Sequence, residues 1–180
     1  MSGPRYAMTM DTRRCVGCHA CVFACQAENA LLEHGYRDWI KVTTRGRFPN
    51  LTQVIHSERC NHCEHPPCVT ACPTGASHVN KGGTVLVNHS KCTGCKACIA
   101  ACPYDARYVH PEGYVDKCTF CLHRTSKGKL TACVENCPTK ALDFGDLEDP
   151  KSAVSKHLNE RPHGVLRPEL GLRPKMFFLK

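Results

Sequence analysis

The sequence lacks a long apolar run, because no stretch approaches 18 consecutive apolar residues. A transmembrane helix needs about 20 such residues, so none is expected. The first 14 residues also lack the apolar segment of a signal peptide. Arg13 and Arg14 form a twin-arginine pair, but cysteines from Cys15 onward stand where the apolar region of such a signal belongs. We therefore expect no signal and no membrane anchor within this sequence.

Motifs of substrate chemistry are also absent. The sequence has no P-loop, no G-x-G-x-x-G and no nucleophile with a recognisable partner base. Basic runs of 5 to 8 residues and nucleic-acid motifs are lacking too. The formal net charge of +8 is therefore interpreted as dispersed surface charge rather than as a nucleic-acid surface.

Ordinary core-forming residues are scarce. Cysteine is counted within the 42% hydrophobic fraction, and without the 16 cysteines about a third of the 180 residues remains apolar. A chain of this length makes one domain or two small lobes. Because so thin a core gives little stability, disulfides or metals are expected to hold the fold.

Cysteine is what the sequence has in abundance, and it falls into four groups of four with none left over. The groups are Cys15-x2-Cys18-x2-Cys21-x3-Cys25, Cys60-x2-Cys63-x4-Cys68-x3-Cys72, Cys92-x2-Cys95-x2-Cys98-x3-Cys102 and Cys118-x2-Cys121-x11-Cys133-x3-Cys137. The first and third have the C-x2-C-x2-C-x3-C spacing of bacterial ferredoxins. The last cysteine of groups two, three and four begins a repeated C-P-x-x-A unit, whereas the first group has Gln26 in place of proline.

Three other uses of cysteine fit less well than 4Fe–4S clusters. Structural zinc needs two separated C-x2-C pairs, so the first and third groups are too dense, although the fourth alone fits. A disulfide framework needs export, and cysteines three apart on a tight loop pair poorly. The C-x3-C-x2-C motif of a radical-SAM site is absent. The spacing therefore predicts four 4Fe–4S clusters, whose roughly −2 charge per site would offset the net positive charge.

The spacing also predicts how the groups pair. Three cysteines within seven residues curl around one cluster, while the fourth is carried on a helical turn toward a neighbouring cluster. Groups two and three are separated by only 19 residues, so we expect them to form one two-cluster lobe. Groups one and four then pair across this insertion.

The predicted fold class is α+β, with two ferredoxin-like lobes that each hold two 4Fe–4S clusters and an extended C-terminal arm. Strands are expected at 6–10, 39–43, 51–56 and 84–87, and helices at 20–32 and 152–158. The predicted lobes are 1–30 with 103–145, and 31–102 with an insertion at 31–59. Segment 146–180 forms the arm, packed on a partner or on the lobes because residues 176–179 are strongly apolar; the alternative is a disordered tail.

Several phrases together resemble a known family. They are Cys-x2-Cys-Glu-x-Pro-Pro-Cys at 60–68, Cys-Pro-Thr-Gly-Ala-Ser at 72–77, Ala-Cys-Pro-Tyr-Asp-Ala-Arg-Tyr at 101–108, Asp-Lys-Cys-x2-Cys at 116–121 and Phe-Gly-Asp-Leu at 144–147. With the order of the cysteine groups, they resemble the iron–sulfur subunit of the dimethyl sulfoxide reductase superfamily, closest to the B subunit of polysulfide/thiosulfate reductase. The resemblance covers essentially the whole sequence.

The resemblance implies four ligand sets. Cys15, Cys18, Cys21 and Cys137 would bind the cluster nearest a molybdenum subunit, and Cys25, Cys118, Cys121 and Cys133 the next. Cys60, Cys63, Cys68 and Cys102 would bind the third, and Cys72, Cys92, Cys95 and Cys98 the last, nearest a membrane subunit and its quinone.

The resemblance also implies a function. The chain would be a non-catalytic electron-transfer subunit between a quinone-reactive membrane subunit and a molybdopterin catalytic subunit, for polysulfide or thiosulfate reduction in anaerobic respiration. It would meet the membrane only through these partners, on the periplasmic side, with a cytoplasmic location as the alternative. Arsenate, tetrathionate or dimethyl sulfoxide reduction, a free polyferredoxin and a purely structural metal module stay open.

Other polar residues lie close to the cysteines in the sequence. His19, His62 and His65 are expected near the clusters or at the surface rather than as ligands, because cysteines already fill every ligand position. Lys91 and Lys96 lie beside ligands of the third group, where a cation would raise the reduction potential of the last cluster. Asn61, Thr93 and Thr119 are candidates to donate hydrogen bonds to cysteine or cluster sulfur, which would also raise a reduction potential.

Overall fold

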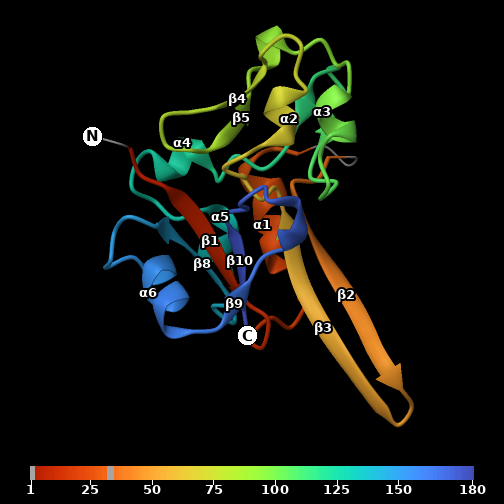
Figure 1. The fold of residues 1–180 in the computed structure, drawn as a ribbon, viewed down its shortest axis with the longest axis vertical. Helices are drawn as coiled ribbons and strands as arrows, with labels where there is room; N and C mark the ends of the chain where they lie inside the picture. Colours follow the sequence, from red (N-terminus) through yellow and green to blue (C-terminus); the bar gives the residue numbers. More distant parts are fainter. Residues whose placement is uncertain (1–2, 32–34) are drawn as a thin grey trace.

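The computed structural model describes residues 3–31 and 35–180 and has mixed α+β structure (Figure 1). The strands are β1 (Tyr6–Asp11), β2 (Asp38–Arg47), β3 (Asn50–Arg59), β4 (Ser77–Val79), β5 (Val85–Val87), β6 (Tyr108–Val109), β7 (Val115–Asp116), β8 (Leu142–Asp146), β9 (His163–Gly164) and β10 (Met176–Leu179). The helices are α1 (Ala20–Glu28), α2 (Pro67–Thr70), α3 (Ala97–Ala100), α4 (Leu122–Thr125), α5 (Ala132–Glu135) and α6 (Ala153–Glu160), with 3-10 turns η1 (His89–Lys91) and η2 (Pro168–Leu170). The expected α+β class is confirmed.

A four-stranded sheet organises the half of the molecule that contains both termini. Its strand order is β8-β1-β10-β9, with β1 antiparallel to β8 and parallel to β10. Met8 and Met10 are buried in the same core as cysteines of the first and fourth groups, while α6 packs against β1 and β8. β1 is buried on both faces, and the first cysteine loop begins a few residues after it.

The second and third cysteine groups occupy the other half. Here the short hairpin β4–β5 lies beside α2 and α3, shown in yellow and green in Figure 1. Its small core contains Cys68, Val85, Cys98 and Val115. Cysteines thus make up half of the buried residues of this small core.

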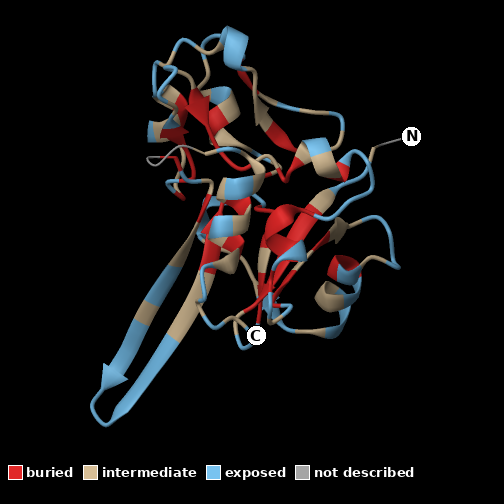
Figure 2. Ribbon diagram, turned by 180° about the vertical axis from the view of Figure 1, so that it is seen from behind, coloured by how far each residue is buried: buried red, intermediate tan, exposed pale blue. Residues whose placement is uncertain are grey.

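A long hairpin, β2–β3, projects from the body (Figures 1 and 2). The strands predicted at 39–43 and 51–56 lie within it, but both are longer than expected. Its base is buried, and its distal part is exposed, with Phe48 at the tip 88% accessible. The base therefore belongs to the core, whereas the distal part is largely exposed to solvent.

The C-terminal segment packs on the rest of the protein, as one of the two expectations has it, but it is more regular than an extended arm. It contains α6, and its apolar end forms β10, which lies between β1 and β9. Met176 and Leu179 are each 1% exposed in that sheet. Backbone bonds from Lys175 N to the carbonyl of Asn61 (2.8 Å) and from Glu64 N to the carbonyl of Arg173 (3.0 Å) tie the segment to the second cysteine loop. It is therefore neither a disordered tail nor dependent on a partner for its burial.

Three smaller expectations have mixed outcomes. The helix predicted over 20–32 ends at Glu28, and its predicted end at Leu32 lies outside the described residues. The strand predicted at 84–87 begins at Val85, and the helix predicted at 152–158 is α6, capped by Ser152. Within residues 3–31 and 35–180, the structure has no helix of the length and apolarity that crossing a membrane requires.

Candidate iron–sulfur cluster sites

Glycine gives the first and third cysteine loops the same turn. Gly17 and Gly94 both have φ of +68°, a backbone conformation that side chains disfavour. The helices that follow, α1 and α3, both start after a left-handed residue, His19 and Lys96 respectively. A Cβ at Gly94 would lie 2.4 Å from the carbonyl oxygen of Gly113, so glycine is required there for packing as well. The two loops therefore point their cysteines inward by the same backbone path.

Three cavities are each lined by four cysteines. The first is lined by Cys15, Cys18, Cys21 and Cys137. The second is lined by Cys60, Cys63, Cys68 and Cys102. The third is lined by Cys72, Cys92, Cys95 and Cys98. In each, three cysteines come from one group and one from its pairing partner.

The remaining four cysteines also approach one another. Cys25 lies on α1, which packs against α5 with Cys133, and Cys118 and Cys121 precede α4. Burial raises the pKa of the Cys25 thiol, and the neighbouring Cys118 and Cys133 raise it further. Burial likewise raises the pKa of Cys121, with a contribution from Cys133. These four cysteines are thus close enough for their charges to interact.

The chemistry of the cavities suits clusters better than the other uses of cysteine. All 16 cysteines are free thiols, so no disulfide framework forms. Among the residues that the structure describes, no three His, Cys, Asp or Glu side chains are arranged to hold a single metal ion. Four sulfurs that line one cavity suit a cubane, which takes one thiolate at each of its four irons, better than mononuclear zinc.

The C-P-x-x-A repeat presents hydrogen-bond donors to sulfur. Ser77 N donates to Cys72 Sγ and Ala141 N donates to Cys137 Sγ, each at 3.3 Å. The Thr74 and Thr139 hydroxyls each lie 3.7 Å from the same sulfurs. Burial raises the pKa of both thiols, but these hydrogen bonds outweigh it and the net pKa is lowered. Such donors favour thiolate and raise the reduction potential of a cluster bound there.

Sequence reasoning missed the buried cations next to the cysteines. Arg59 Nη1 donates to Cys133 Sγ at 2.8 Å, and Arg107 Nη2 donates to Cys68 Sγ at 2.9 Å. The ammonium of Lys117 is buried and donates to the carbonyl of Cys118 at 2.6 Å. Burial lowers the pKa of Lys117. Arg59 directly precedes Cys60 and Lys117 directly precedes Cys118, which is the only signal for them in the sequence.

The histidines and lysines singled out in the sequence have different surroundings. His19 and His65 are exposed, whereas His62 is buried and stacks on Phe120 at a ring separation of 3.8 Å. His62 Nδ1 accepts from Val85 N–H at 3.2 Å, and burial, with Lys117 second, holds its pKa well below the usual value. The buried imidazole of His62 is therefore expected to be neutral and to pack between the cysteine loop and Phe120.

The other polar candidates lie at the edge of the third cavity or away from sulfur. The lysine side chains Lys91 and Lys96 are exposed, and Lys96 and Thr93 line the third cavity. The amide of Asn61 donates to the carbonyl of Arg59 at 3.3 Å. The threonine hydroxyls that approach sulfur are those of the repeat and that of Thr131, which lies 3.3 Å from Cys133 Sγ.

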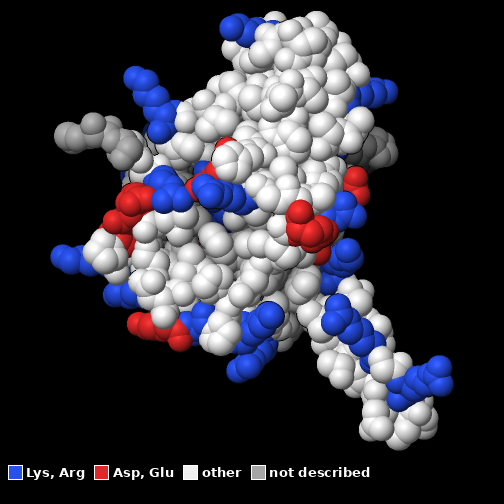
Figure 3. All heavy atoms as spheres, viewed as in Figure 1, with Lys and Arg blue, Asp and Glu red and all other residues white. Residues whose placement is uncertain are grey.

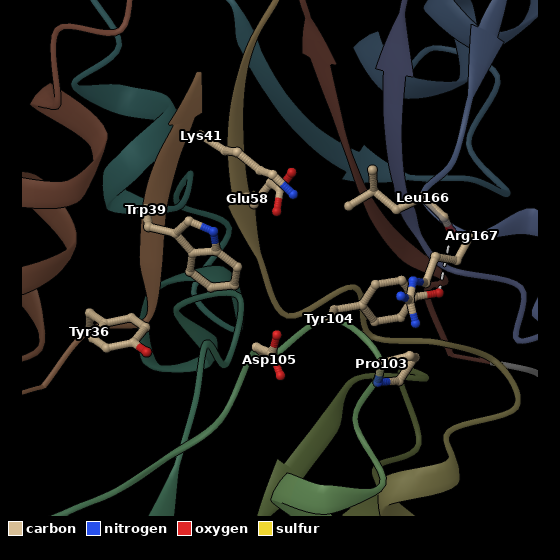
Figure 4. A pocket seen from close by; sticks show the side chains of 9 residues that line it. All are labelled: Tyr36, Trp39, Lys41, Glu58, Pro103, Tyr104, Asp105, Leu166 and Arg167. Carbon is tan, nitrogen blue, oxygen red and sulfur yellow. Dashed lines mark hydrogen bonds between the residues drawn. The ribbon is translucent and has the colours of Figure 1, made fainter. Parts of the chain in front are cut away.

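An open groove of about 560 Å³ lies where the base of the hairpin meets the second half and the C-terminal segment (Figure 4). Trp39 and Tyr36 line one side and Arg167 the other. Tyr104 lines both this groove and the second cavity, and its hydroxyl donates to the carbonyl of Leu166 at 3.4 Å. The groove therefore leads from solvent to within one side chain of a cysteine cavity.

Exposure changes along the four sets. Cys18 in the first cavity and Cys95 in the third are exposed, whereas the set of Cys25, Cys118, Cys121 and Cys133 is entirely buried. The set in the second cavity is buried except for Cys102, which is half-buried. Cys60 and Cys118 are close enough for the charge of one to raise the pKa of the other, so the two buried sets are neighbours. The arrangement thus has two accessible ends and a protected middle.

Comparison with known proteins gives consistent matches along the sequence. Residues 51–147 match a family described as a 4Fe-4S dicluster domain, and residues 14–76 match a second family with the same description. The two dicluster matches and the 16 cysteines fit four 4Fe–4S clusters.

The relatives are reductase subunits. The sequence is 46% identical to the B chain of polysulfide reductase from Wolinella succinogenes, over 97% of this protein and 94% of that one. It is 41% identical to the B subunit of tetrathionate reductase from Salmonella typhimurium, over 97% and 72%, respectively. A putative dimethyl sulfoxide reductase iron-sulfur subunit of Halobacterium salinarum is 35% identical over 97% and 78%. This protein therefore belongs to the iron–sulfur subunits of the dimethyl sulfoxide reductase superfamily.

Proposed function

We propose that the protein is the electron-transfer subunit of a molybdopterin-containing reductase complex. Its four 4Fe–4S clusters would pass electrons between a quinone-reactive membrane partner and a molybdenum catalytic partner. The observation that carries this proposal is the gradient of exposure, with accessible cysteines at two ends and buried sets between them. Such an arrangement suits a conductor with separate entry and exit points.

The ligand sets in this proposal follow the four groupings of cysteines. Cys15, Cys18, Cys21 and Cys137 would hold the first cluster, and Cys25, Cys118, Cys121 and Cys133 the second. Cys60, Cys63, Cys68 and Cys102 would hold the third, and Cys72, Cys92, Cys95 and Cys98 the fourth. Each of the two lobes, 1–30 with 103–145 and 31–102, would then supply all ligands of two clusters. The three cavities and the charge interactions within the second set support these groupings.

Bound clusters supply one-electron redox centres, and the protein's own residues adjust them. Thiolates hold the iron, and backbone N–H groups donate to Cys72 and Cys137. Burial of the two middle sets keeps water away from the central part of the path. No substrate step is assigned to this subunit itself.

The catalytic partner would contact the end that bears Cys18. Val16 and Phe23 flank this end and are 62% and 66% exposed. Apolar side chains gathered around an accessible cysteine suit a protein contact better than free solvent. The membrane partner would contact the opposite end, at Cys95. The subunit would then be held at the membrane by its partners, on the periplasmic side.

Polysulfide or thiosulfate is the substrate class that we propose for the complex. This follows from the likeness to the B components of polysulfide reductase and tetrathionate reductase. Tetrathionate, arsenate and dimethyl sulfoxide are the competing substrates, because reductase subunits named for each of them are among the relatives.

Freeze-quench spectroscopy of the purified complex tests the proposal. A reduced quinol analogue is expected to reduce the clusters, and polysulfide is expected to reoxidise them within turnover time. Tetrathionate, arsenate and dimethyl sulfoxide are offered in parallel to identify the acceptor. Clusters that neither take electrons from quinol nor give them to any of these acceptors would refute the role.

A free polyferredoxin is a second candidate because the apolar end of the chain is buried in its own sheet. Expression of the protein alone distinguishes the two. A stable monomer that retains its clusters and is not captured by the catalytic and membrane subunits supports the carrier, whereas stoichiometric capture supports the complex.

A further inference from the structure

Two arginines are buried among the cysteines, one in each half of the molecule. Arg59 is 1% exposed and Arg107 is 5% exposed. Burying a guanidinium is costly unless its charge and its N–H groups find partners. Each of these arginines donates to one cysteine sulfur and to one serine hydroxyl.

Arg107 connects two of the proposed ligand sets. Its Nη2 lies 2.9 Å from Cys68 Sγ and 2.9 Å from Ser77 Oγ. Ser77 lines the neighbouring cavity, and its N–H donates to Cys72 Sγ at 3.3 Å. One side chain thus links a sulfur of the third set with the wall of the fourth.

Arg107 also has N–H groups available for a cluster. Its Nε and Nη1 are buried and have no hydrogen-bond partner among the described protein atoms, although the side chain lines the second cavity. Cluster sulfides in that cavity would accept hydrogen bonds from Nε and Nη1. The free-energy cost of burying these N–H groups would then be offset.

Arg59 makes the equivalent connection in the other half. Its Nη1 donates to Cys133 Sγ at 2.8 Å, and its Nη2 donates to Ser57 Oγ. Ser57 lines the first cavity and lies 3.4 Å from Cys21 Sγ. The same arginine–serine pair therefore stands between the two proposed clusters of each half.

The two arginines differ in whether a carboxylate lies beside the guanidinium group. Arg59 Nη2 lies 3.2 Å from a carboxylate oxygen of Asp38, and both side chains are buried. Within residues 3–31 and 35–180, Arg107 has no carboxylate within 4.0 Å. Arg59 thus brings its own counter-ion, whereas Arg107 brings an uncompensated positive charge.

We propose that Arg107 is a potential-setting residue, which raises the reduction potentials of the third and fourth clusters, while the Arg59–Asp38 pair leaves the first and second nearly unchanged. Reduction adds one negative charge to a cluster, and a nearby buried cation favours that charge. The consequence is a potential step between the halves of the molecule. This inference rests on the ligand sets proposed above.

Potentiometric titration of the complex, monitored by electron paramagnetic resonance, tests the inference. With Arg107→Gln, the ratio of reduced to oxidised third and fourth clusters at a fixed potential is expected to fall about tenfold, equivalent to about 59 mV for one electron. Arg107→Lys keeps the charge and is expected to retain most of the potential. The first and second clusters are expected to titrate as in the parent complex.

Two matched pairs separate charge from packing. The double variant Arg59→Gln/Asp38→Asn removes no net charge, so the potentials of its first and second clusters are expected to shift less than those of the third and fourth clusters in Arg107→Gln. Ser77→Asp gives Arg107 a counter-ion and is expected to lower the potentials of the third and fourth clusters further than the uncharged Ser77→Asn does. If Arg107→Gln loses its clusters, the comparison of Ser77→Asp with Ser77→Asn decides.

Failure of the inference and failure of the ligand sets look different. Four intact clusters with unmoved potentials in both Arg107→Gln and Ser77→Asp would overturn the role of Arg107. Equal shifts in Ser77→Asp and Ser77→Asn would also overturn it. Wrong ligand sets would instead appear as loss of the wrong cluster when Cys68 or Cys72 is replaced by alanine.

Discussion

Single residues decide whether the cysteine loops close, and Gly94 is the most constrained of them. Its φ of +68° and the 2.4 Å approach of a Cβ to the Gly113 carbonyl oxygen both require glycine. Gly94→Ala is expected to cost about 1–2 kcal/mol for the backbone conformation alone, and more for the collision. Iron content and thermal midpoint measure this loss.

Gly128→Ala is the control for that substitution. Gly128 has a similar φ of +72°, but nothing lies within 4 Å of the added Cβ. Its thermal midpoint is expected to fall by the backbone cost alone, and so less than that of Gly94→Ala, with full iron content. Equal losses in the two variants would show that the contact with Gly113 does not matter.

The crossed ligation can be tested at Cys137. This side chain lines the cavity of Cys15, Cys18 and Cys21, although its neighbours in sequence belong to the fourth group. Cys137→Ala is expected to remove the same paramagnetic signal as Cys18→Ala. Cys133→Ala is expected to match Cys121→Ala instead. A Cys137→Ala spectrum that matches Cys121→Ala would contradict the crossed sets.

At the scale of elements, β10 holds the two halves together. Met176 pairs with Met8 of β1, and the preceding residues bond to the loop of the second cysteine group. Truncation of a buried methionine to alanine costs about 2–5 kcal/mol. Met176→Ala is therefore expected to lower the denaturation midpoint of the cluster-loaded protein markedly.

Phe48→Ala at the tip of the β2–β3 hairpin serves as the comparison. Phe48 is 88% exposed, so its truncation is expected to change stability by no more than about 0.5 kcal/mol. A midpoint that falls as far in Phe48→Ala as in Met176→Ala would argue against β10 as a structural element.

The elements also show what sequence could and could not predict. Cysteine spacing is local, so the four groups and the four 4Fe–4S clusters could be predicted from it. The pairing of residues 176–179 with β1 joins opposite ends of the chain, and no local pattern indicates such a partner. Arg59 reaches a cysteine 74 residues away and Arg107 one 39 residues away, so their roles depend on the fold rather than on spacing.

At the scale of the whole molecule, positive charge is spread over the face shown in Figure 3. Lysine and arginine lie at several places on the body, with acidic groups among them, and a further group follows the projecting hairpin. Clusters bound to thiolates would offset the formal charge of +8.

Stability of the whole molecule is expected to depend on iron. Cysteines occupy both buried cores, and the free thiols would leave cavities there. Because metal binding is then coupled to folding, chelation of iron is expected to abolish the sharp thermal transition and the native far-ultraviolet spectrum. A metal-free protein that keeps both would contradict this coupling.

The most direct test is iron and acid-labile sulfide analysis of the purified protein, with electron paramagnetic resonance after dithionite reduction. The account predicts about 16 iron and about 16 sulfide per molecule, brown colour and signals of reduced 4Fe–4S clusters. Colourless protein with zinc or no metal, and no paramagnetic signal after reduction, would contradict it.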